Sequence, residues 1–272
     1  MSKIAFCLNA STIRPTPLIE KIRIAAEAGY DAIELWSNEL TEYVEGGGTL
    51  AEVKRALDDA GLAVPTLIAL FGWLGSTGEA HARAIDEAKM KMEQAAAVGA
   101  THVIASPPRE AVDLSRGGEQ YRELLEIGAS FGVKPAMEFL GFVQSVYTIE
   151  QAWKIVEDAD HPDATIVMDP FHILRGGGDV ASIAEVPGSR VAIWHWNDVP
   201  GTKPIPEMTD ADRVLPGDGV GPLEEIARLA LEAGYSGYVS LELFNEALWA
   251  QDPFEVARIG LDKTRGFFVE NK

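Results

Sequence analysis

Short apolar runs alternate with amphipathic segments along the whole chain. The apolar runs are rich in Val, Ile, Leu and aromatic residues, which is typical of strands buried on both faces. In chain order they cover residues 3–9, 31–36, 62–70, 101–106, 133–139, 165–169, 191–196 and 237–243. Segments with helical periodicity follow them at 17–29, 50–61, 78–98, 117–130, 148–159, 179–185, 221–233 and 253–269. This alternation predicts an α/β protein of eight strand–helix pairs, a (β/α)8 TIM barrel.

Local signals predict where several of these elements begin and end. Gly29, Gly61 and Gly99 directly follow three of the helical segments, as expected for left-handed helix caps. Thr148 with Gln151 three residues later forms the pattern of a capping box at a helix start. Pro65 lies within the third apolar run and predicts an irregular strand there.

The alternation is continuous, with no linker, low-complexity tract or charge block between segments. We therefore expect residues 1–272 to form a single TIM-barrel domain. An open doubly wound sheet is the alternative, with its site at a switch in strand order. No G-x-G-x-x-G motif opens a helix after the first strand, which disfavours that alternative.

Four of the predicted strands end on a residue type that binds metals: Glu138, Asp169, His195 and Glu242. A parallel barrel delivers the carboxyl ends of its strands to one face, so these side chains can meet. Any one of them alone is equally well explained as a helix cap or an ion pair. Buried together they need a compensating charge, and three carboxylates with one imidazole suit one divalent ion. We expect Mn²⁺, with Zn²⁺, Co²⁺ or Mg²⁺ as alternatives.

Polar residues just beyond these strand ends are candidates for binding a substrate. His172, in the motif DPFH, can offer a neutral imidazole to a substrate oxygen or pack beneath a helix. Asp198, in HWND, can orient a ligand or contact the substrate. Arg213, in TDADRVLPGDG, can anchor substrate oxygens if its loop overhangs the site, or be solvated. Gly217 and Gly219 predict a tight turn in that loop.

Composition narrows the classes of partner. The formal net charge of −19 disfavours nucleic acid, because a protein that binds it must neutralise phosphates. No apolar stretch reaches the ~20 residues that cross a membrane. Cys7 is the single cysteine and lies in an apolar run, so we expect a buried thiol rather than a nucleophile. The start of the chain lacks the pattern of a signal peptide, and we expect a cytoplasmic protein.

At these residues the chain resembles the xylose-isomerase-like TIM barrels, which include endonuclease IV, ketose 3-epimerases, hydroxypyruvate isomerase and enzymes of inositol catabolism. The resemblance extends over nearly the whole chain. It is carried by CLNAST, EAGYDAIEL, MEFLGF, MDPFHILRGG, WHWNDVP, TDADRVLPGDG and VSLELF. The last two motifs are the more specific ones and are most similar to the branch that isomerises 2-keto-myo-inositol.

The resemblance implies that the four strand-end residues hold the divalent ion and that His172 and Arg213 contact the substrate. It implies that Glu138 and Glu242 are an acid/base pair that moves a proton next to a carbonyl, through an ene-diolate. The expected reaction converts 2-keto-myo-inositol to 1-keto-D-chiro-inositol, a small-molecule substrate. A homo-oligomer is left open.

At two positions this chain differs from other branches of the family. Val214 and Leu215 follow Arg213 where endonuclease IV continues with a histidine ligand, which disfavours DNA repair. Gln144 replaces a second Glu of the ketose 3-epimerases, and we expect it beside the substrate. A ketose or keto-sugar 3-epimerase, a lyase acting on a 3-keto-glycoside, and a non-catalytic sugar-binding barrel remain as alternatives.

Overall fold

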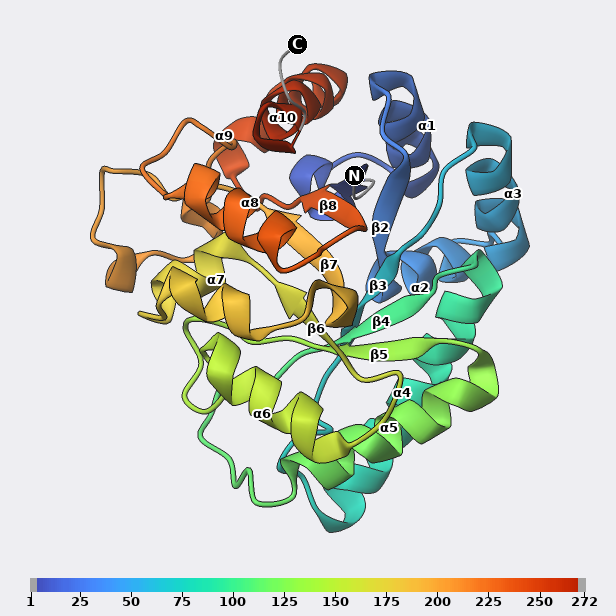
Figure 1. Cartoon of the computed structure of the whole chain (residues 1–272). Helices are drawn as coiled ribbons and strands as arrows, with labels where there is room; N and C mark the ends of the chain where they lie inside the picture. The colour runs from blue at the N-terminus through green and yellow to red at the C-terminus, as the bar shows by residue number, and fades with distance from the viewer. Residues whose placement is uncertain (1–3, 269–272) are drawn as a thin grey trace.

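The computed structural model describes residues 4–268, which form a closed barrel of eight parallel strands. Each strand pairs with the next in the chain, and β8 pairs with β1 (Figure 1). The strands are β1 (Ala5–Asn9), β2 (Ala32–Trp36), β3 (Thr66–Leu70), β4 (His102–Ala105), β5 (Lys134–Met137), β6 (Thr165–Met168), β7 (Val191–Trp196) and β8 (Tyr238–Leu241). The predicted (β/α)8 barrel is confirmed.

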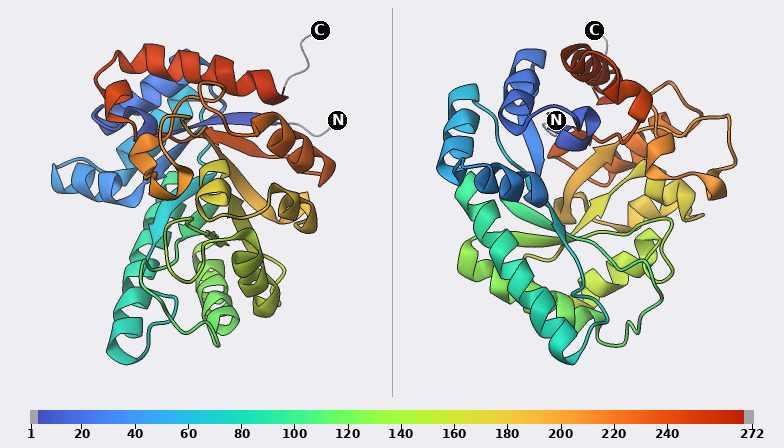
Figure 2. Two further views of the ribbon diagram at one scale, coloured as in Figure 1. Left: turned by 90° about the vertical axis from the view of Figure 1, so that its left-hand side faces the viewer. Right: turned by 180° about the vertical axis from the view of Figure 1, so that it is seen from behind.

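The helices surround the barrel as an outer ring, as Figure 2 shows from two further sides. They are α1 (Leu18–Ala28), α2 (Ser37–Glu45), α3 (Leu50–Ala60), α4 (Gly78–Val98), α5 (Gly117–Phe131), α6 (Ile149–Ala159), α7 (Pro170–Arg175), α8 (Leu223–Glu232), α9 (Glu246–Trp249) and α10 (Pro253–Phe268). The last helix, α10, packs beside α1 and closes the ring. In the described part of the chain, no helix has the length and apolar character that a membrane span needs.

The predicted helix boundaries agree closely with the structure. Gly29, Gly61 and Gly99 end α1, α3 and α4 with positive φ angles of 91°, 69° and 80°. The Thr148 hydroxyl accepts from the backbone N–H of Gln151 and the Gln151 side chain accepts in return, so the capping box at α6 is formed. These local signals succeed because each acts within one helical turn.

Three short helices and one strand boundary differ from the prediction. The helices α2, α7 and α9 lie in segments for which no helix was predicted. The short helix predicted at 179–185 is present as a 3-10 helix, Val180–Glu185. The signals for α7 are nevertheless present, because Asp169 caps it and Pro170 occupies its first position. Strand β3 begins only at Thr66, directly after Pro65, which cannot donate a backbone hydrogen bond.

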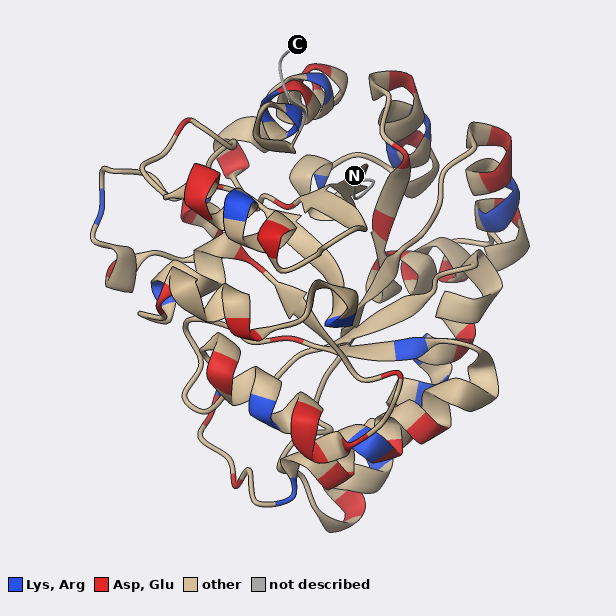
Figure 3. Ribbon diagram, in the orientation of Figure 1, with Lys and Arg blue, Asp and Glu red and all other residues tan. Residues whose placement is uncertain are grey.

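The core has two main layers and a small separate cluster of Phe171, Val199 and Met208. The larger lies between the strands and the helices, and a smaller one inside the barrel takes apolar side chains from β3 to β7: Ile68, Ala69, Ile104, Ala136, Val167 and Ile193. Acidic and basic residues are interspersed on the outer helices, whereas the strands are nearly free of them (Figure 3). A carboxylate inside the barrel therefore needs a specific explanation.

Candidate metal centre and active site

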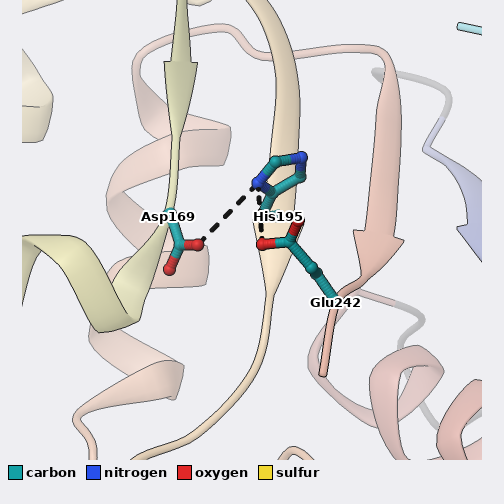
Figure 4. A group of neighbouring side chains, drawn as sticks. All are labelled: Asp169, His195 and Glu242. Atoms are coloured by element: carbon teal, nitrogen blue, oxygen red, sulfur yellow. Dashed lines mark ion pairs between the residues drawn. The ribbon is translucent and has the colours of Figure 1, made fainter. Parts of the chain in front are cut away.

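Three side chains converge at the carboxyl ends of β6, β7 and β8. Asp169, His195 and Glu242 each offer one ligand atom, and these atoms all lie within 4.8 Å of one another (Figure 4). Nδ1 of His195 lies 3.1 Å from Oε2 of Glu242 and 3.8 Å from Oδ2 of Asp169. All three side chains are buried, so the barrel brings together three of the four residues expected to bind a metal.

The two oxygens of Asp169 have separate surroundings. Oδ1 accepts from the backbone N–H of Phe171 at 2.7 Å and from Nδ2 of Asn197 at 3.1 Å. Oδ2 is left facing His195 and Arg213. The start of helix α7 therefore fixes the carboxylate with one oxygen toward the centre of the site.

His195 is held so that Nδ1 faces the two carboxylates. Its Nε2 lies 3.2 Å from Oε1 of Glu34, while the buried Nδ1 has no hydrogen-bond partner among the described residues. Burial disfavours a charge on the ring, but Glu242 and Glu34 raise the pKa of His195 well above its usual value. The position stabilises positive charge, and an unpartnered imidazole nitrogen beside two carboxylates fits a divalent ion.

Glu138 lies beside this three-residue group rather than within it. It follows β5, is only 8% exposed and accepts a 2.6 Å hydrogen bond from the Ser106 hydroxyl. Burial raises the pKa of Glu138 to about 8, although the charge of His195 and the hydrogen bond from Ser106 act in the opposite direction. Glu138 is thus a carboxyl group that can carry a proton near neutral pH.

Arg213 reaches the centre of the site and is 1% exposed. Its Nη1 donates to Oε2 of Glu242 at 2.6 Å and to Oδ2 of Asp169 at 2.9 Å. Burial alone would raise the pKa of Asp169, but the charge of Arg213 is the largest of the opposing effects and the pKa is lowered. The loop after β7 therefore supplies a buried cation to the site.

The second guanidinium nitrogen of Arg213 faces His172. Nη2 lies 3.0 Å from Nε2 of His172 and donates to Oδ1 of Asp210 at 2.7 Å. Burial lowers the pKa of His172, which favours a neutral ring with one donor and one acceptor nitrogen. Nε2 faces Arg213, and the backbone N–H of Gly141 lies 3.3 Å from Nδ1. The structure brings His172 and Arg213 together, in a site where both are buried.

A cavity of about 270 Å³ opens above these groups. It is lined by Trp36, Ile68, Phe71, Ser106, Pro107, Pro108, Arg109, Glu138, Leu140, Phe142, His172, Asp210, Arg213, Glu242 and Phe244. Apolar and aromatic walls surround a few converging polar groups, the usual composition of a small-molecule site. The volume fits one small ring or short chain rather than a polymer.

Asp198 occupies a different place from the expected substrate residues. Oδ2 accepts from the backbone N–H groups of Gly217 and Gly219, and Oδ1 from those of Gly221 and Val199. Its backbone also pairs with that of Val214, directly after Arg213. Asp198 therefore holds the loop that carries Arg213.

The predicted tight turn is present in this loop. Gly217 has a φ angle of 81°, and a Cβ atom on Gly219 would lie 2.2 Å from the carbonyl oxygen of Val199. Gln144, in contrast, is exposed on the loop after β5, and among the described residues it is not part of the cavity lining. The structure does not bring Gln144 together with the other candidates.

Two buried polar residues of the site, Asn9 and Glu34, were not predicted from the sequence; both are 0% exposed. Burial disfavours the ionised form of Glu34, but its pKa is lowered because His195 and several hydroxyl groups interact with the carboxylate. An acid inside the otherwise apolar run AIELW was the available signal, because such a residue requires buried partners.

The fold and the site together define a class, the (β/α)8 barrels with a candidate metal centre at the carboxyl ends of the strands. Residues 22–265 match the family described as xylose isomerase-like TIM barrel, and the chain belongs to this family.

Similar proteins extend over nearly the whole chain. The inosose isomerase of Halalkalibacterium halodurans is 31% identical over 95% of this chain and 94% of its own length, and that of Bacillus subtilis is 30% identical over 93% and 94%. A 3-dehydroshikimate dehydratase of Pseudomonas putida is 28% identical over 90% of this chain but only 39% of its own length. A crystal structure of the IOLI protein with a binding zinc atom superposes with a TM-score of 0.90 at 27% identity, covering 97% of each chain.

Proposed function

We propose that this protein is a divalent-metal-dependent isomerase of a keto-polyol, with 2-keto-myo-inositol as substrate and 1-keto-D-chiro-inositol as product. One observation carries the proposal: Glu138 and Glu242 line the same small cavity, beside the group of Asp169, His195 and Glu242. Similarity to proteins named inosose isomerase over nearly the full chain supports the choice of substrate.

Asp169, His195 and Glu242 would hold the ion, with Glu138 as the fourth ligand. When bound, a divalent ion supplies a Lewis acid that polarises a ketone and acidifies the neighbouring C–H bond. The sequence favours Mn²⁺, and the zinc in the similar IOLI structure makes Zn²⁺ the second ion to test. Both are compatible with oxygen and nitrogen ligands.

The two glutamates supply the proton transfer. One of Glu138 and Glu242 removes the proton from the carbon next to the ketone, and the other returns a proton to the adjacent carbon. Ser106 positions Glu138, and Arg213 positions Glu242. The result is a shift of the carbonyl group between neighbouring carbons.

The remaining lining residues would bind and shield the polyol. Arg213 and His172 face the cavity with groups that can hydrogen-bond hydroxyl or carbonyl oxygens. Trp36 and Phe244 pack edge to face and offer apolar surface to the C–H groups of a ring. Such walls also exclude water from a reactive ene-diolate.

Product analysis tests this function. The protein loaded with Mn²⁺ or Zn²⁺ is expected to convert 2-keto-myo-inositol, and a chelator should abolish the conversion. Glu138→Gln and Glu242→Gln should each lower kcat at least ~100-fold, the usual effect of losing a general acid or base. Glu232→Gln, at an exposed surface pair with Arg228, is the matched control. Near-normal turnover by both site variants with metal bound would show that the two-glutamate scheme is wrong.

The second candidate reaction is elimination next to a ketone, because one of the similar proteins is named as a dehydratase. A lyase acting on a 3-keto-glycoside would use the same proton abstraction and then expel a group from the next carbon. A ketose or keto-sugar 3-epimerase would return the proton to its original carbon. An unsaturated product, or an epimer in place of a shifted carbonyl, would identify these reactions directly.

A further inference from the structure

Glu34 is a buried carboxylate on β2, and Asp169 follows β6, four strands away around the closed barrel. Oε2 accepts from Nδ2 of Asn9 at 3.0 Å and from the hydroxyl of Ser240, and Oε1 accepts from the hydroxyl of Thr66. Nε2 of His195 lies 3.2 Å from the same Oε1. Every protein group around this carboxylate can donate a hydrogen bond to it.

An ionised carboxylate only accepts hydrogen bonds, so the ring nitrogen that faces Glu34 must carry a proton. In the neutral ring that a metal ligand requires, this places the proton on Nε2 and leaves the lone pair on Nδ1. Nδ1 is the nitrogen that faces Glu242 and Asp169. Glu34 thereby selects the tautomer of His195 in which the lone pair points to the centre of the ligand group.

Asn9 connects this carboxylate to the other side of the site. Its Nδ2 donates to Oε2 of Glu34 at 3.0 Å and to Oε1 of Glu242 at 2.9 Å. Its Oδ1 accepts from the backbone N–H of Ser11 at 2.9 Å and from Nε1 of Trp36 at 3.1 Å. All four hydrogen bonds of the amide are made, so its orientation is fixed and Glu242 keeps Oε2 toward His195.

We propose that Glu34 and Asn9 are a positioning pair that prepares His195 and Glu242 to bind the metal. Glu34 sets which nitrogen of His195 is available, and Asn9 sets which oxygen of Glu242 is available. This inference rests on the metal site of the proposed function but not on the identity of the substrate. It assigns a role to two strands, β1 and β2, that supply none of the metal ligands.

Zinc affinity measured by competition with a chromophoric chelator tests the pair. Glu34→Gln should weaken zinc binding about 10–100-fold, the usual effect of removing a partner that orients a histidine ligand. Thr66→Val is the matched control, because it removes another hydrogen bond to the same oxygen of Glu34 without touching His195 or Glu242. We expect its zinc affinity to stay within about threefold of the wild type.

The spectrum of the Co²⁺-loaded protein separates positioning from general stability. Glu34→Gln should change the visible absorption of the bound cobalt, because the ligand geometry changes, whereas Thr66→Val should leave it unchanged. Asn9→Ala should weaken zinc binding about tenfold. In the double variant of Glu34→Gln and Asn9→Ala, zinc affinity should fall by less than the product of the two single effects, because the two residues share a hydrogen bond. Zinc affinity of Glu34→Gln within twofold of the wild type, with an unchanged cobalt spectrum, would overturn the proposal.

A measurement on the wild type keeps the test valid if Glu34→Gln does not fold. In the zinc-loaded protein labelled with ¹⁵N, the side-chain signals of His195 can be identified among the five histidines by their loss in His195→Gln. The proposal requires a proton on Nε2 and metal on Nδ1. The reverse assignment would contradict it. None of these measurements uses a substrate, so a failure to isomerise keto-inositol would leave their outcome intact.

Discussion

The hydroxyl of Ser106, directly after β4, donates a 2.6 Å hydrogen bond to Oε2 of Glu138, directly after β5. This contact joins two neighbouring strand ends at the cavity and fixes one member of the proposed acid/base pair. It also partly offsets the cost of burying that carboxyl group.

Ser106→Ala should therefore lower kcat about tenfold, because a hydrogen bond contributes about 0.5–1.5 kcal/mol and its loss frees the Glu138 side chain. KM should change little, since the hydroxyl positions Glu138 rather than the substrate. Steady-state kinetics with Mn²⁺ measures both constants. Ser115→Ala, which removes an exposed hydrogen bond to Asp113, is the control. An unchanged kcat in Ser106→Ala would contradict the positioning role.

The raised pKa of Glu138 predicts a pH-dependent stability in the chelator-treated protein. Because the pKa rises from 4.5 to about 8 on folding, the native state binds more protons than the unfolded state between these values. The stabilisation is present below pH 4.5 and is lost as the pH rises through 8. From pH 6 to pH 8.5, the wild type should lose about 2 kcal/mol more unfolding free energy than Glu138→Gln. Urea denaturation at both pH values measures the difference, and parallel curves for the two proteins would refute it.

Arg213 is predicted to be essential for stability when no metal is added. Arg213→Gln leaves Asp169 and Glu242 buried without their guanidinium partner, which should cost about 3–5 kcal/mol in unfolding free energy. A divalent ion replaces part of the missing positive charge, so adding metal should raise the Tm of this variant more than that of the wild type. Thermal unfolding with chelator and with Zn²⁺ tests this. Equal shifts of Tm in both proteins would contradict the charge argument.

Arg228→Gln is the surface control for that experiment. Arg228 pairs with Glu232, but both side chains are more than half exposed. Exposed pairs contribute only about 0–1 kcal/mol. This variant should unfold like the wild type with and without metal.

Asp198 is predicted to act through its loop. Asp198→Asn replaces the carboxylate oxygen that accepts from Gly217 and Gly219 with an NH₂ group, which cannot accept these hydrogen bonds. This change should lower the unfolding free energy by about 1–3 kcal/mol. We expect a higher KM, because the loop carries Arg213, and faster proteolytic cleavage within residues 214–221. Asp218→Asn, which affects only an exposed pair with Lys263, should behave like the wild type. Wild-type proteolysis by Asp198→Asn would show that the carboxylate does not hold the loop.

The barrel and the strand-end residues could be predicted because they depend on regular geometry. Once eight strands are recognised, the ends that carry Asp169, His195 and Glu242 must lie on one face of the barrel. The glycine caps and the capping box of α6 could also be predicted, because each depends on residues within one helical turn. The start of α7 was also readable, since Asp169 and Pro170 are strong helix-start signals that the apolar pattern concealed.

The remaining features depend on contacts that no local pattern encodes. Glu34 meets His195 from 161 positions earlier in the chain, and Asn9 meets Glu242 from 233 positions earlier. These pairs follow from barrel closure and from the register of β1, β2 and β8. Asp198 looked like a site residue because it follows His195 closely, yet the path of the loop turns its carboxylate toward glycine N–H groups.

Proton NMR of the metal-loaded protein with 2-keto-myo-inositol in D₂O, beside a chelator-treated sample, tests the proposed isomerisation directly. An isomerase that removes a proton next to the ketone should incorporate deuterium into the substrate and produce a second keto-inositol only when metal is present. Deuterium uptake should be lost in Glu138→Gln and Glu242→Gln. The absence of exchange and of new product, with metal shown to be bound, would contradict the proposed isomerisation.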